Sequence, residues 1–555
     1  MASERAKVPV VNISYSRFKK FLPGVSVEKI LEILPYAGLD IEGADSDMTR
    51  LEYNPNRPDF SSDYGIFRAL RGIMGIETGL PKFKLGRTNL SVVVDSQTRT
   101  IRPHIVALAA KGGTLDNNTI KQLIAMQEDL HDGIGRRRKK ASIGLHNLDS
   151  IRFPVTYTVA DPNFSFVPLG ETSPRSIRQV LEETATGRQF GRILGRVDRY
   201  PVIVDKSGSL LSLPPIINGD VTKVDEKTRN LFVEVTATGR KVADDVLAII
   251  AVTLRDAGFD VSSVDIRSRG KIFKSPEMGT TSISVDVTYV DSVLGLNLDA
   301  RQITSCLKKS RLGALAKGSR IICEIPRYRT DISHPIDIAE EVAIGFGIYN
   351  FEPTLPASPS AGTRSEESKY IDAIRKVLAG LGMLESLNFS LTSFDTEYGL
   401  FDRSALDPLG VEGPKSAEHE FLRDSLIPSL LQSLSRNVHE EYPQKLFEIG
   451  KVFHGGSAIR ENWAIAAVTA HEDAGYTEIK AYMQALLNSC FGMRCHTLSA
   501  ASPFFIPGRS ANILVDGGIV GSVGEIMPLA LEKLKMRVPV SAFEIDLGRL
   551  LHLSQ

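Results

Sequence analysis

The stretch from Tyr328 to Phe351 constrains the fold more than any other part of the sequence, because it combines a helix start with a dense group of acids. Pro335 suits the first helical position, where its missing N–H and its fixed φ cost nothing. Ser333 or His334 can cap such a helix. The spacing therefore predicts a helix over 335–346 whose apolar stripe consists of Ile336, Ala339, Ala343 and Phe346.

Four carboxylates fall within eleven residues of this stretch, namely Asp331, Asp337, Glu340 and Glu341. The last three share one helical face, where like charges repel by roughly 0.2–0.5 kcal/mol per pair. A hard cation would relieve this repulsion, and oxygen ligands favour magnesium over zinc or copper. Acids in the first turn also interact favourably with the helix macrodipole, by about 0.3–1 kcal/mol each, so the residues alone leave both interpretations open.

The segment RTDISHPIDIAEEVAIGFGIYNFEPTLP, residues 329–356, resembles the signature of phenylalanyl-tRNA synthetase beta subunits in their short archaeal and eukaryotic form. In that family four acids at these offsets hold a magnesium ion near the alpha subunit. The resemblance implies that the ion is shared with alpha and held here by Asp331, Asp337, Glu340 and Glu341. It also implies a tetramer of two alpha and two beta subunits that uses ATP and tRNA(Phe) as substrates.

Length and composition limit the possible classes of protein. A chain of 555 residues is too long for one core and suggests three or four domains. Sixty-six basic and sixty-six acidic residues cancel, which argues against coating nucleic acid through bulk charge. The four cysteines form no CxxC pair, and we find no signal peptide and no apolar run of about 18 residues. These features favour a cytoplasmic protein without a membrane partner.

The order of elements predicts an α+β multidomain chain. The family resemblance implies that its acidic-helix domain is small and winged-helix-like, and that its last domain is an antiparallel sheet similar to the class II synthetase core. The expected divisions are an N-terminal α/β domain at 1–85, a mixed editing-like domain at 88–262, a magnesium or acidic-helix domain at 268–352, a linker at 353–364 and a non-catalytic class II synthetase-like core at 365–555.

Local patterns add expectations for single elements. The NPNRPDF segment is typical of a turn, and Ser61 or Ser62 can cap the helix that follows. Arg57 and Asp59 can lock this turn or contact substrate or RNA. Residues 283–295 predict a strand and a turn. A helix near 120–131 is expected to bury Ile120, Leu123, Ile124 and Met126.

A run of five basic residues follows Gly133 and Gly135 and consists of Arg136, Arg137, Arg138, Lys139 and Lys140. Such a run on a glycine-flanked loop is a plausible phosphate contact, although basic runs are more often solvated surface. The family resemblance favours contact with RNA.

Residues 201–258 resemble the editing domain of archaeal and eukaryotic phenylalanyl-tRNA synthetase beta subunits, where PPIING and the next strand line a pocket that hydrolyses mischarged tyrosyl-tRNA. A second site that hydrogen-bonds the extra hydroxyl of tyrosine supplies discrimination that a phenylalanine site lacks. The resemblance suggests Ser212, Asn218, Glu234 and Thr236. These residues could equally be ordinary strand residues, and the GTD of the family is replaced here by Ala237-Thr238-Gly239-Arg240.

The last domain lacks the residues that an ATP site of class II needs, which are arginines on the phosphates and an acid for magnesium. Phe421-Leu422-Arg423 has no FRxE pair, and Gly508-Arg509 lies outside a glycine array. We therefore expect no catalytic residue for aminoacylation in this chain. The predicted function is the beta subunit of phenylalanine--tRNA ligase, with editing of mischarged Tyr-tRNA(Phe).

Two alternatives remain at this point. The first is a freestanding tRNA-binding or aminoacyl-tRNA deacylating protein without ligase activity. The second is a magnesium-dependent phosphoryl-transfer enzyme that uses the acidic cluster alone. The sequence contains no GxxxxGK[ST] loop, kinase motif set or nucleophile elbow, which weighs against the second alternative.

Overall fold

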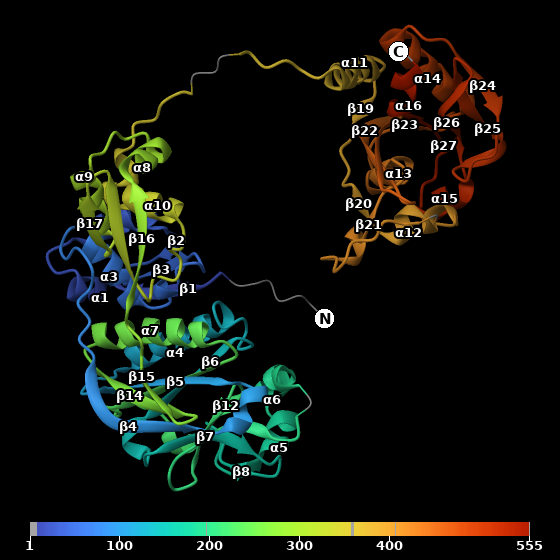
Figure 1. The fold of residues 1–555 in the computed structure, drawn as a ribbon. Helices are drawn as coiled ribbons and strands as arrows, with labels where there is room; N and C mark the ends of the chain where they lie inside the picture. The colour runs from blue at the N-terminus through green and yellow to red at the C-terminus, as the bar shows by residue number, and fades with distance from the viewer. Residues whose placement is uncertain (1–7, 196, 357–359, 406, 554–555) are drawn as a thin grey trace. The chain divides into compact units, whose positions relative to one another are not determined.

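The computed structural model describes residues 8–195, 197–356, 360–405 and 407–553. The chain divides into two compact units on either side of residues 354 and 355, and each unit is considered by itself (Figure 1). Within the described residues, no helix is both long enough and apolar enough to cross a membrane.

The first unit begins with a small three-stranded sheet and three helices. The sheet has the order β1-β3-β2. Its elements are β1 (Val10–Ser14), α1 (Tyr15–Phe21), α2 (Val27–Ile33), β2 (Leu39–Ala44), β3 (Met48–Tyr53) and α3 (Asp63–Ile73). Ser62 caps α3 as predicted, because its side chain accepts a hydrogen bond from the Gly65 N–H. Ile66 and Leu70 of α3 are buried in the core of this part.

A ten-stranded mixed sheet follows in the order β12-β11-β10-β7-β4-β14-β5-β13-β6, and β15 pairs with β14. Its strands are β4 (Gly86–Val94), β5 (His104–Lys111), β6 (Ala141–Asn147), β7 (Val155–Ala160), β10 (Tyr200–Val204), β11 (Leu210–Leu213), β12 (Ile217–Asn218), β13 (Leu231–Ala237), β14 (Asp260–Ser268) and β15 (Lys271–Ser275). Its end strands approach each other, since Asn218 of β12 donates to the Leu145 carbonyl of β6 at 3.4 Å. The sheet is therefore a nearly closed barrel.

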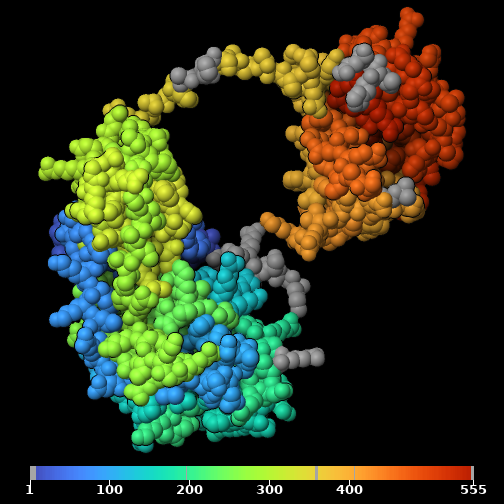
Figure 2. All heavy atoms as spheres, in the orientation of Figure 1, coloured from blue at the N-terminus to red at the C-terminus, as the bar shows by residue number. Residues whose placement is uncertain are grey.

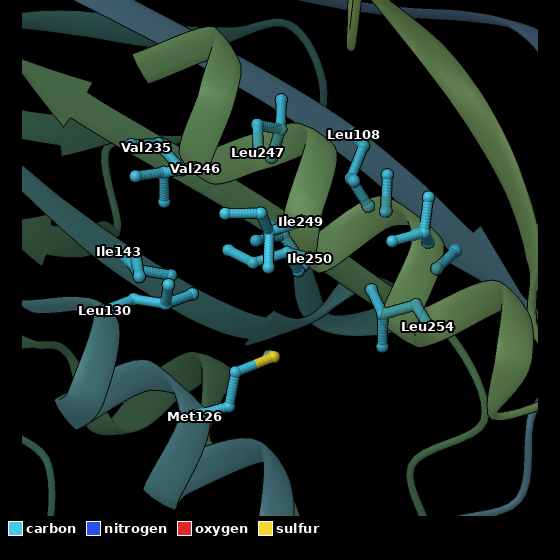
Figure 3. Packing of buried hydrophobic residues seen from close by; sticks show 14 of the residues in the cluster. Leu108, Met126, Leu130, Ile143, Val235, Val246, Leu247, Ile249, Ile250 and Leu254 are labelled. Atoms are coloured by element: carbon cyan, nitrogen blue, oxygen red, sulfur yellow. The ribbon is translucent and has the colours of Figure 1, made fainter. Parts of the chain in front are cut away.

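Two helices cover the outer face of this barrel, α4 (Asn117–Asp132) and α7 (Arg240–Asp256). Figure 3 shows Ile249 and Ile250 of α7 and Met126 of α4 gathered in the core between the helices and the sheet. Side chains alternate along β13, so Val233 and Val235 join this core while Glu234, the residue between them, points into the barrel. The expected burial of Ile124 is wrong, because this side chain is 52% exposed at the rim of a cavity.

The acidic helix belongs to a third part of the first unit. It is α10 (Pro335–Phe346), with the bounds that the sequence predicts. The other elements are β16 (Thr280–Asp286), α8 (Val287–Leu294), α9 (Ala300–Lys309), β17 (Gly313–Lys317) and β18 (Arg320–Pro326). The blue N-terminal residues lie directly against the yellow-green residues of this part in Figure 2, where α3 contacts α9.

The expected strand and turn over 283–295 is wrong beyond Asp286, where the chain forms α8. Val287, Val290 and Leu294 contact the core of this part. Their i, i+3, i+7 spacing is helical, and this burial outweighs the preference of β-branched residues for strands.

The second unit is a seven-stranded sheet in the order β19-β22-β23-β27-β26-β25-β24, antiparallel except between β19 and β22. Its strands are β19 (Leu384–Glu385), β22 (Gln444–His454), β23 (Arg460–Ala470), β24 (Cys495–Ser499), β25 (Phe505–Val515), β26 (Gly518–Ile526) and β27 (Val540–Asp546). The helices α11 (Glu366–Gly380), α14 (Tyr476–Phe491) and α16 (Leu547–Leu553) pack on one face, and α13 (Ile427–Arg436) and α15 (Pro528–Lys533) on the other.

A carboxylate with a raised pKa lies at the centre of this second sheet. Glu544 of β27 accepts hydrogen bonds from the Ser425 hydroxyl (2.5 Å) and from the Leu426 N–H (2.8 Å). Burial raises the pKa of Glu544 from 4.5 to about 7. The folded state therefore holds this proton at pH values where the unfolded chain has released it.

We expect the second unit to lose stability as the pH rises from about 4.5 towards 7, because the folded pKa of Glu544 lies above its unfolded pKa. One pKa unit corresponds to about 1.4 kcal/mol, and partial solvent exposure reduces the total to roughly 2 kcal/mol. The variant Glu544→Gln should show a flatter pH dependence. Trp463, the one tryptophan of the chain, lies in β23 of this unit and reports urea unfolding by fluorescence. Equal pH slopes in both proteins would contradict this expectation.

Candidate functional site

Two of the four predicted magnesium ligands converge on an arginine. Arg329 donates to Asp331 through Nε (2.9 Å) and Nη2 (2.6 Å), and it also pairs with Glu341. The side chains of Arg329 and Glu341 are buried. Arg57 adds a second positive charge, because its Nε lies 4.0 Å from Asp331 Oδ2. The charges of Asp331 and Glu341 are thus balanced within the chain.

The other two predicted ligands, Asp337 and Glu340, face outward. Asp337 Oδ2 accepts hydrogen bonds from the N–H groups of Ser333 and His334, both at 2.7 Å, and so caps α10. Glu340 is exposed and has no hydrogen bond or ion pair within the part of the chain that the structure describes. Burial and the neighbouring carboxylates of Glu341, Asp331 and Asp337 raise the pKa of Glu340.

This geometry defines what the acidic cluster can do by itself. Among the described residues, no group of three or more His, Cys, Asp or Glu side chains is arranged to hold a metal ion. Arg329 lies between Asp331 and Glu341, so the outward ligands are Glu340 and the second oxygen of Asp337. Magnesium requires six oxygen ligands in near-ideal octahedral geometry. The chain alone therefore offers an incomplete ligand set of the right chemical type.

The NPNRPDF turn braces the acidic cluster. Arg57 forms two hydrogen bonds of 2.9 Å to Asp59 and stacks on Phe60, with 3.8 Å between the guanidinium and the ring centroid. Arg68 of the next helix pairs with Asp256 of α7 and lies over the ring of Tyr328. Arg57 thus locks the turn, one of its two predicted roles, and also contacts the acidic cluster.

A cavity of about 490 Å³ lies at the seam of the barrel, between α4, β6 and the segment that follows β11. It contains two of the four predicted editing residues, Ser212 and Asn218. It also contains Arg138 of the basic run. Two separate predictions from the sequence, an editing pocket and a basic loop, therefore meet at one cavity.

Glu234 and Thr236, the other two predicted editing residues, lie inside the barrel on β13. Both are buried, Glu234 with 1% exposure and Thr236 with none. Glu234 stands opposite Gly144 of β6 in the ladder, and Phe232 stands opposite His146. A Cβ atom on Gly144 would lie 2.4 Å from Glu234 Oε1 and 2.6 Å from His146 Nε2. The glycine therefore gives the Glu234 side chain room to lie over β6.

Two polar atoms remain unsatisfied beside this glycine. Glu234 Oε2 and His146 Nε2 are buried, and neither has a hydrogen-bond partner within the described ranges. His146 Nδ1 is 2.7 Å from the hydroxyl of Thr222, which lines the cavity, and Nε2 is 4.0 Å from Glu234 Oε1. Buried polar atoms almost always have partners, so a polar group of a ligand or a water fits here.

A buried arginine, which the sequence did not suggest, binds the residues two positions further along the ladder, Thr236 and Ser142. Arg102 Nε donates to the Thr236 hydroxyl at 3.0 Å, and its Nη2 donates to the Ser142 hydroxyl at 3.3 Å and to the Thr236 carbonyl at 2.8 Å. Burial lowers the pKa of Arg102 to about 10. Arg102, Ser142 and His146 are single residues without a motif, so no sequence signal identified them.

The basic run divides into two groups. Arg136, Arg137, Lys139 and Lys140 are exposed. Arg138 is instead held by Glu128 (2.9 Å), the Ile216 carbonyl (3.0 Å) and the ring of Phe190 (4.2 Å to the centroid). The three arginines have positive φ values of 51°, 52° and 63°, a left-handed turn that folds Arg138 back against the cavity. RNA contact by the run stays a prediction.

Arg423, in the Phe421-Leu422-Arg423 segment that lacks the FRxE pair, is buried in the second unit. Arg423 pairs with Glu448 at 2.6 Å and donates to the Lys451 carbonyl at 3.1 Å. Its side chain is therefore committed to the core and is not presented to a phosphate.

Comparisons with known proteins agree with this organisation. The family model for the phenylalanyl tRNA synthetase beta chain CLM domain matches residues 351–547, and that for the tRNA synthetase B5 domain matches residues 283–348. The phenylalanine--tRNA ligase beta subunit of Archaeoglobus fulgidus is 37% identical over 544 residues and covers 98% of each chain. That of Methanococcoides burtonii is 34% identical over 97% of this chain and 100% of its own.

A solved structure adds agreement in three dimensions. It is an N-terminal fragment of the phenylalanyl-tRNA synthetase beta subunit from Pyrococcus horikoshii, with a TM-score of 0.59 and 29% identity over 61% of this chain and 99% of the fragment. Together these matches define a subunit of an aminoacyl-tRNA synthetase. The chain belongs to the family of phenylalanine--tRNA ligase beta subunits, which confirms the resemblance of residues 329–356.

We expect the two adjacent glutamates of α10 to differ in their effect on stability. Glu341→Gln leaves Arg329 with one carboxylate in a buried site, at a cost of roughly 3 kcal/mol. Glu340→Gln removes a repelling charge at the surface and should change stability by less than about 0.5 kcal/mol. Hydrogen exchange of peptides that cover α10 measures both effects in the full chain. Equal protection in the two variants would contradict the role of Arg329.

Proposed function

We propose that this chain is the non-catalytic half of a cytoplasmic phenylalanine--tRNA ligase in which an alpha subunit carries out ATP-dependent attachment of phenylalanine to tRNA(Phe). The full-length identity of 37% to a beta subunit carries this proposal. The core pairing of Arg423 with Glu448 supports it, because an arginine that clamps ATP has to be available to phosphate. The second unit is then a class II-like structural partner in a tetramer of two alpha and two beta subunits.

The proposed magnesium site comprises Asp331, Asp337, Glu340 and Glu341. Their oxygen ligands fit a hard cation, and the family resemblance implies an ion shared with alpha. Bound magnesium would neutralise acidic surface at the subunit boundary. Residues of this chain prepare that surface, because Arg329 and the cap formed by Asp337 fix the helix on which Glu340 stands.

An apolar strip on the second unit supports the docking of alpha. Leu384, Leu387 and Phe389 are 70%, 84% and 77% exposed, and Leu384 lies on β19, an edge strand of the sheet. Side chains of this size at a sheet edge favour pairing with another protein. The proposed occupant is the alpha subunit, because the family resemblance makes alpha the expected partner of this chain.

The cavity of the barrel is the proposed site of editing, the hydrolysis of mischarged Tyr-tRNA(Phe). The unsatisfied atoms Glu234 Oε2 and His146 Nε2 are suited to the tyrosyl hydroxyl, which both donates and accepts hydrogen bonds. Ser212 and Asn218 line the cavity, and Thr236 lies two residues along β13 from Glu234. The exposed residues of the basic run would hold phosphates of the tRNA at the entrance.

A freestanding deacylating protein is the second candidate, and one observation favours it. The cavity and its polar groups lie entirely within the first unit of this chain. Under this proposal hydrolysis of Tyr-tRNA(Phe) uses residues of this chain alone, whereas charging uses the alpha subunit.

The proposed ligase role is tested by mixing the chain with a phenylalanyl-tRNA synthetase alpha subunit. We expect no charging of tRNA(Phe) by this chain alone and charging by the pair. Glu340→Gln should weaken the association by about tenfold in magnesium, or about 1.4 kcal/mol, and have little effect in EDTA. Glu182→Gln, another exposed helical glutamate, is the matched control. Charging by this chain alone would overturn the proposal, and a magnesium-independent loss would remove the shared ion.

The proposed editing role is tested with Glu234→Gln, which keeps the shape and removes the charge. Hydrolysis of Tyr-tRNA(Phe) should slow by roughly 10- to 100-fold, since a hydrogen bond to a charged group contributes about 1.5–3 kcal/mol. Phenylalanine charging by the pair should not change. Wild-type hydrolysis in the variant would exclude Glu234 from recognition of the hydroxyl.

A further inference from the structure

Ser142 and Thr236 face each other across the ladder between β6 and β13, with their hydroxyl oxygens 2.9 Å apart. Each hydroxyl also accepts a hydrogen bond from the same guanidinium, because Arg102 Nε donates to Thr236 and Nη2 donates to Ser142. Ser142 lines the cavity, whereas Thr236 is fully buried behind it. The three side chains form one connected polar group.

One hydroxyl proton of the group formed by Arg102, Ser142 and Thr236 has no acceptor within the group. Arginine has no acceptor, so each hydroxyl proton can go only to the other hydroxyl within this group. One such bond uses one proton, and the described chain provides no other acceptor for the second. A buried donor without a partner costs about 1–3 kcal/mol. Thr236 therefore donates to Ser142, and the free proton belongs to Ser142, which can direct it into the cavity.

We infer that Ser142 presents its hydroxyl proton to the ester carbonyl oxygen of an aminoacyl-tRNA bound in this cavity. This inference rests on the proposed editing function and adds a residue to it. No ion pair of Arg102 occurs among the described residues; its guanidinium donates to the carbonyls of Thr236 and Lys139 and to the two hydroxyls, which it polarises. A hydroxyl polarised in this way is a stronger donor than an isolated serine.

The position of Ser142 agrees with the length of the ligand. Ser142 and Thr236 stand opposite each other in the ladder, and Gly144 and Glu234 form the pair two residues away along the two strands. The two pairs are therefore separated by about 7 Å along the strands. This separation is comparable to the length of a tyrosyl side chain. Glu234 does not line the cavity itself, so a ligand that reaches it with its phenol hydroxyl has to extend past the cavity wall, and its carboxyl end then lies at the level of Ser142, which does line the cavity.

The step that Ser142 assists is ester hydrolysis. The oxygen of a water adds to the carbonyl carbon, and the carbonyl oxygen becomes an oxyanion that accepts the Ser142 proton in a hydrogen bond. The oxyanion then re-forms the carbonyl, the bond to the ribose oxygen breaks, and a proton of the water passes to that oxygen. The products are the free amino acid and the tRNA hydroxyl. A donor of this kind lowers the barrier of the chemical step, so its loss reduces kcat more than it changes KM.

The test uses Ser142→Ala in the full chain with alpha, and steady-state hydrolysis of Tyr-tRNA(Phe). We expect kcat to fall by about 100-fold and KM to change by less than about threefold. Ser142→Thr keeps the hydroxyl and should retain most of the activity. Ser263→Ala is the matched control, because Ser263 is also buried in this sheet but donates to the Gly86 carbonyl.

The outcomes separate the inference from the function on which it rests. A wild-type protein that does not hydrolyse Tyr-tRNA(Phe) overturns both. Wild-type hydrolysis with an unchanged kcat in Ser142→Ala overturns the inference and leaves the editing function intact. If far-UV circular dichroism shows that Ser142→Ala is unfolded, Ser142→Cys replaces it, because a thiol of similar size is a weak donor and should give the same loss of kcat.

Discussion

The two ends of the ten-stranded sheet meet without a backbone ladder, and the cavity exists because of this gap. Side chains bridge the seam instead, with Asn218 bound to the Leu145 carbonyl, Thr222 bound to His146, and Arg138 bound to the Ile216 carbonyl. A barrel that closes completely fills its interior with side chains. Here the bridges satisfy polar groups at the open edges and leave about 490 Å³ between them. Of the four predicted editing residues, Ser212 and Asn218 line this cavity, and Glu234 and Thr236 are buried on β13.

The interior of the barrel is unusual in its charge. Arg102 and Glu234 are both buried within it, yet they form no ion pair with each other among the described contacts. Burying charged groups without pairing them is costly, and a fold selected only for stability would pair or replace them. Arg102 is satisfied by the hydroxyls of Thr236 and Ser142 and by the carbonyls of Thr236 and Lys139, whereas Glu234 Oε2 has no partner among the described residues, so a polar group of a ligand fits beside Glu234.

Sequence patterns predicted the elements well where the signal is local. The bounds of α10 follow from Pro335 and the apolar spacing, and the start of α3 follows from Ser62. They failed in α8, where the β-branched residues suggested a strand although the apolar residues have helical spacing. The site was predictable only in part, because Arg102 reaches Thr236 across 134 positions and this contact depends on strand register. Register is a property of the assembled sheet, so single residues such as Ser142 and His146 carried no signal.

The acidic helix is a second case in which the sequence did not predict a contact that determines the chemistry of the site. The sequence placed four carboxylates together but did not show that Arg329 would lie between Asp331 and Glu341. Arg329 neutralises Asp331 and Glu341, which lie on either side of it. Asp331 and Glu341 thus hold the helix in place, whereas within the described residues Glu340 and the second oxygen of Asp337 have no hydrogen bond. Under the proposed assembly, binding of the ion then depends on ligands from the neighbouring subunit, which couples occupancy of the site to association.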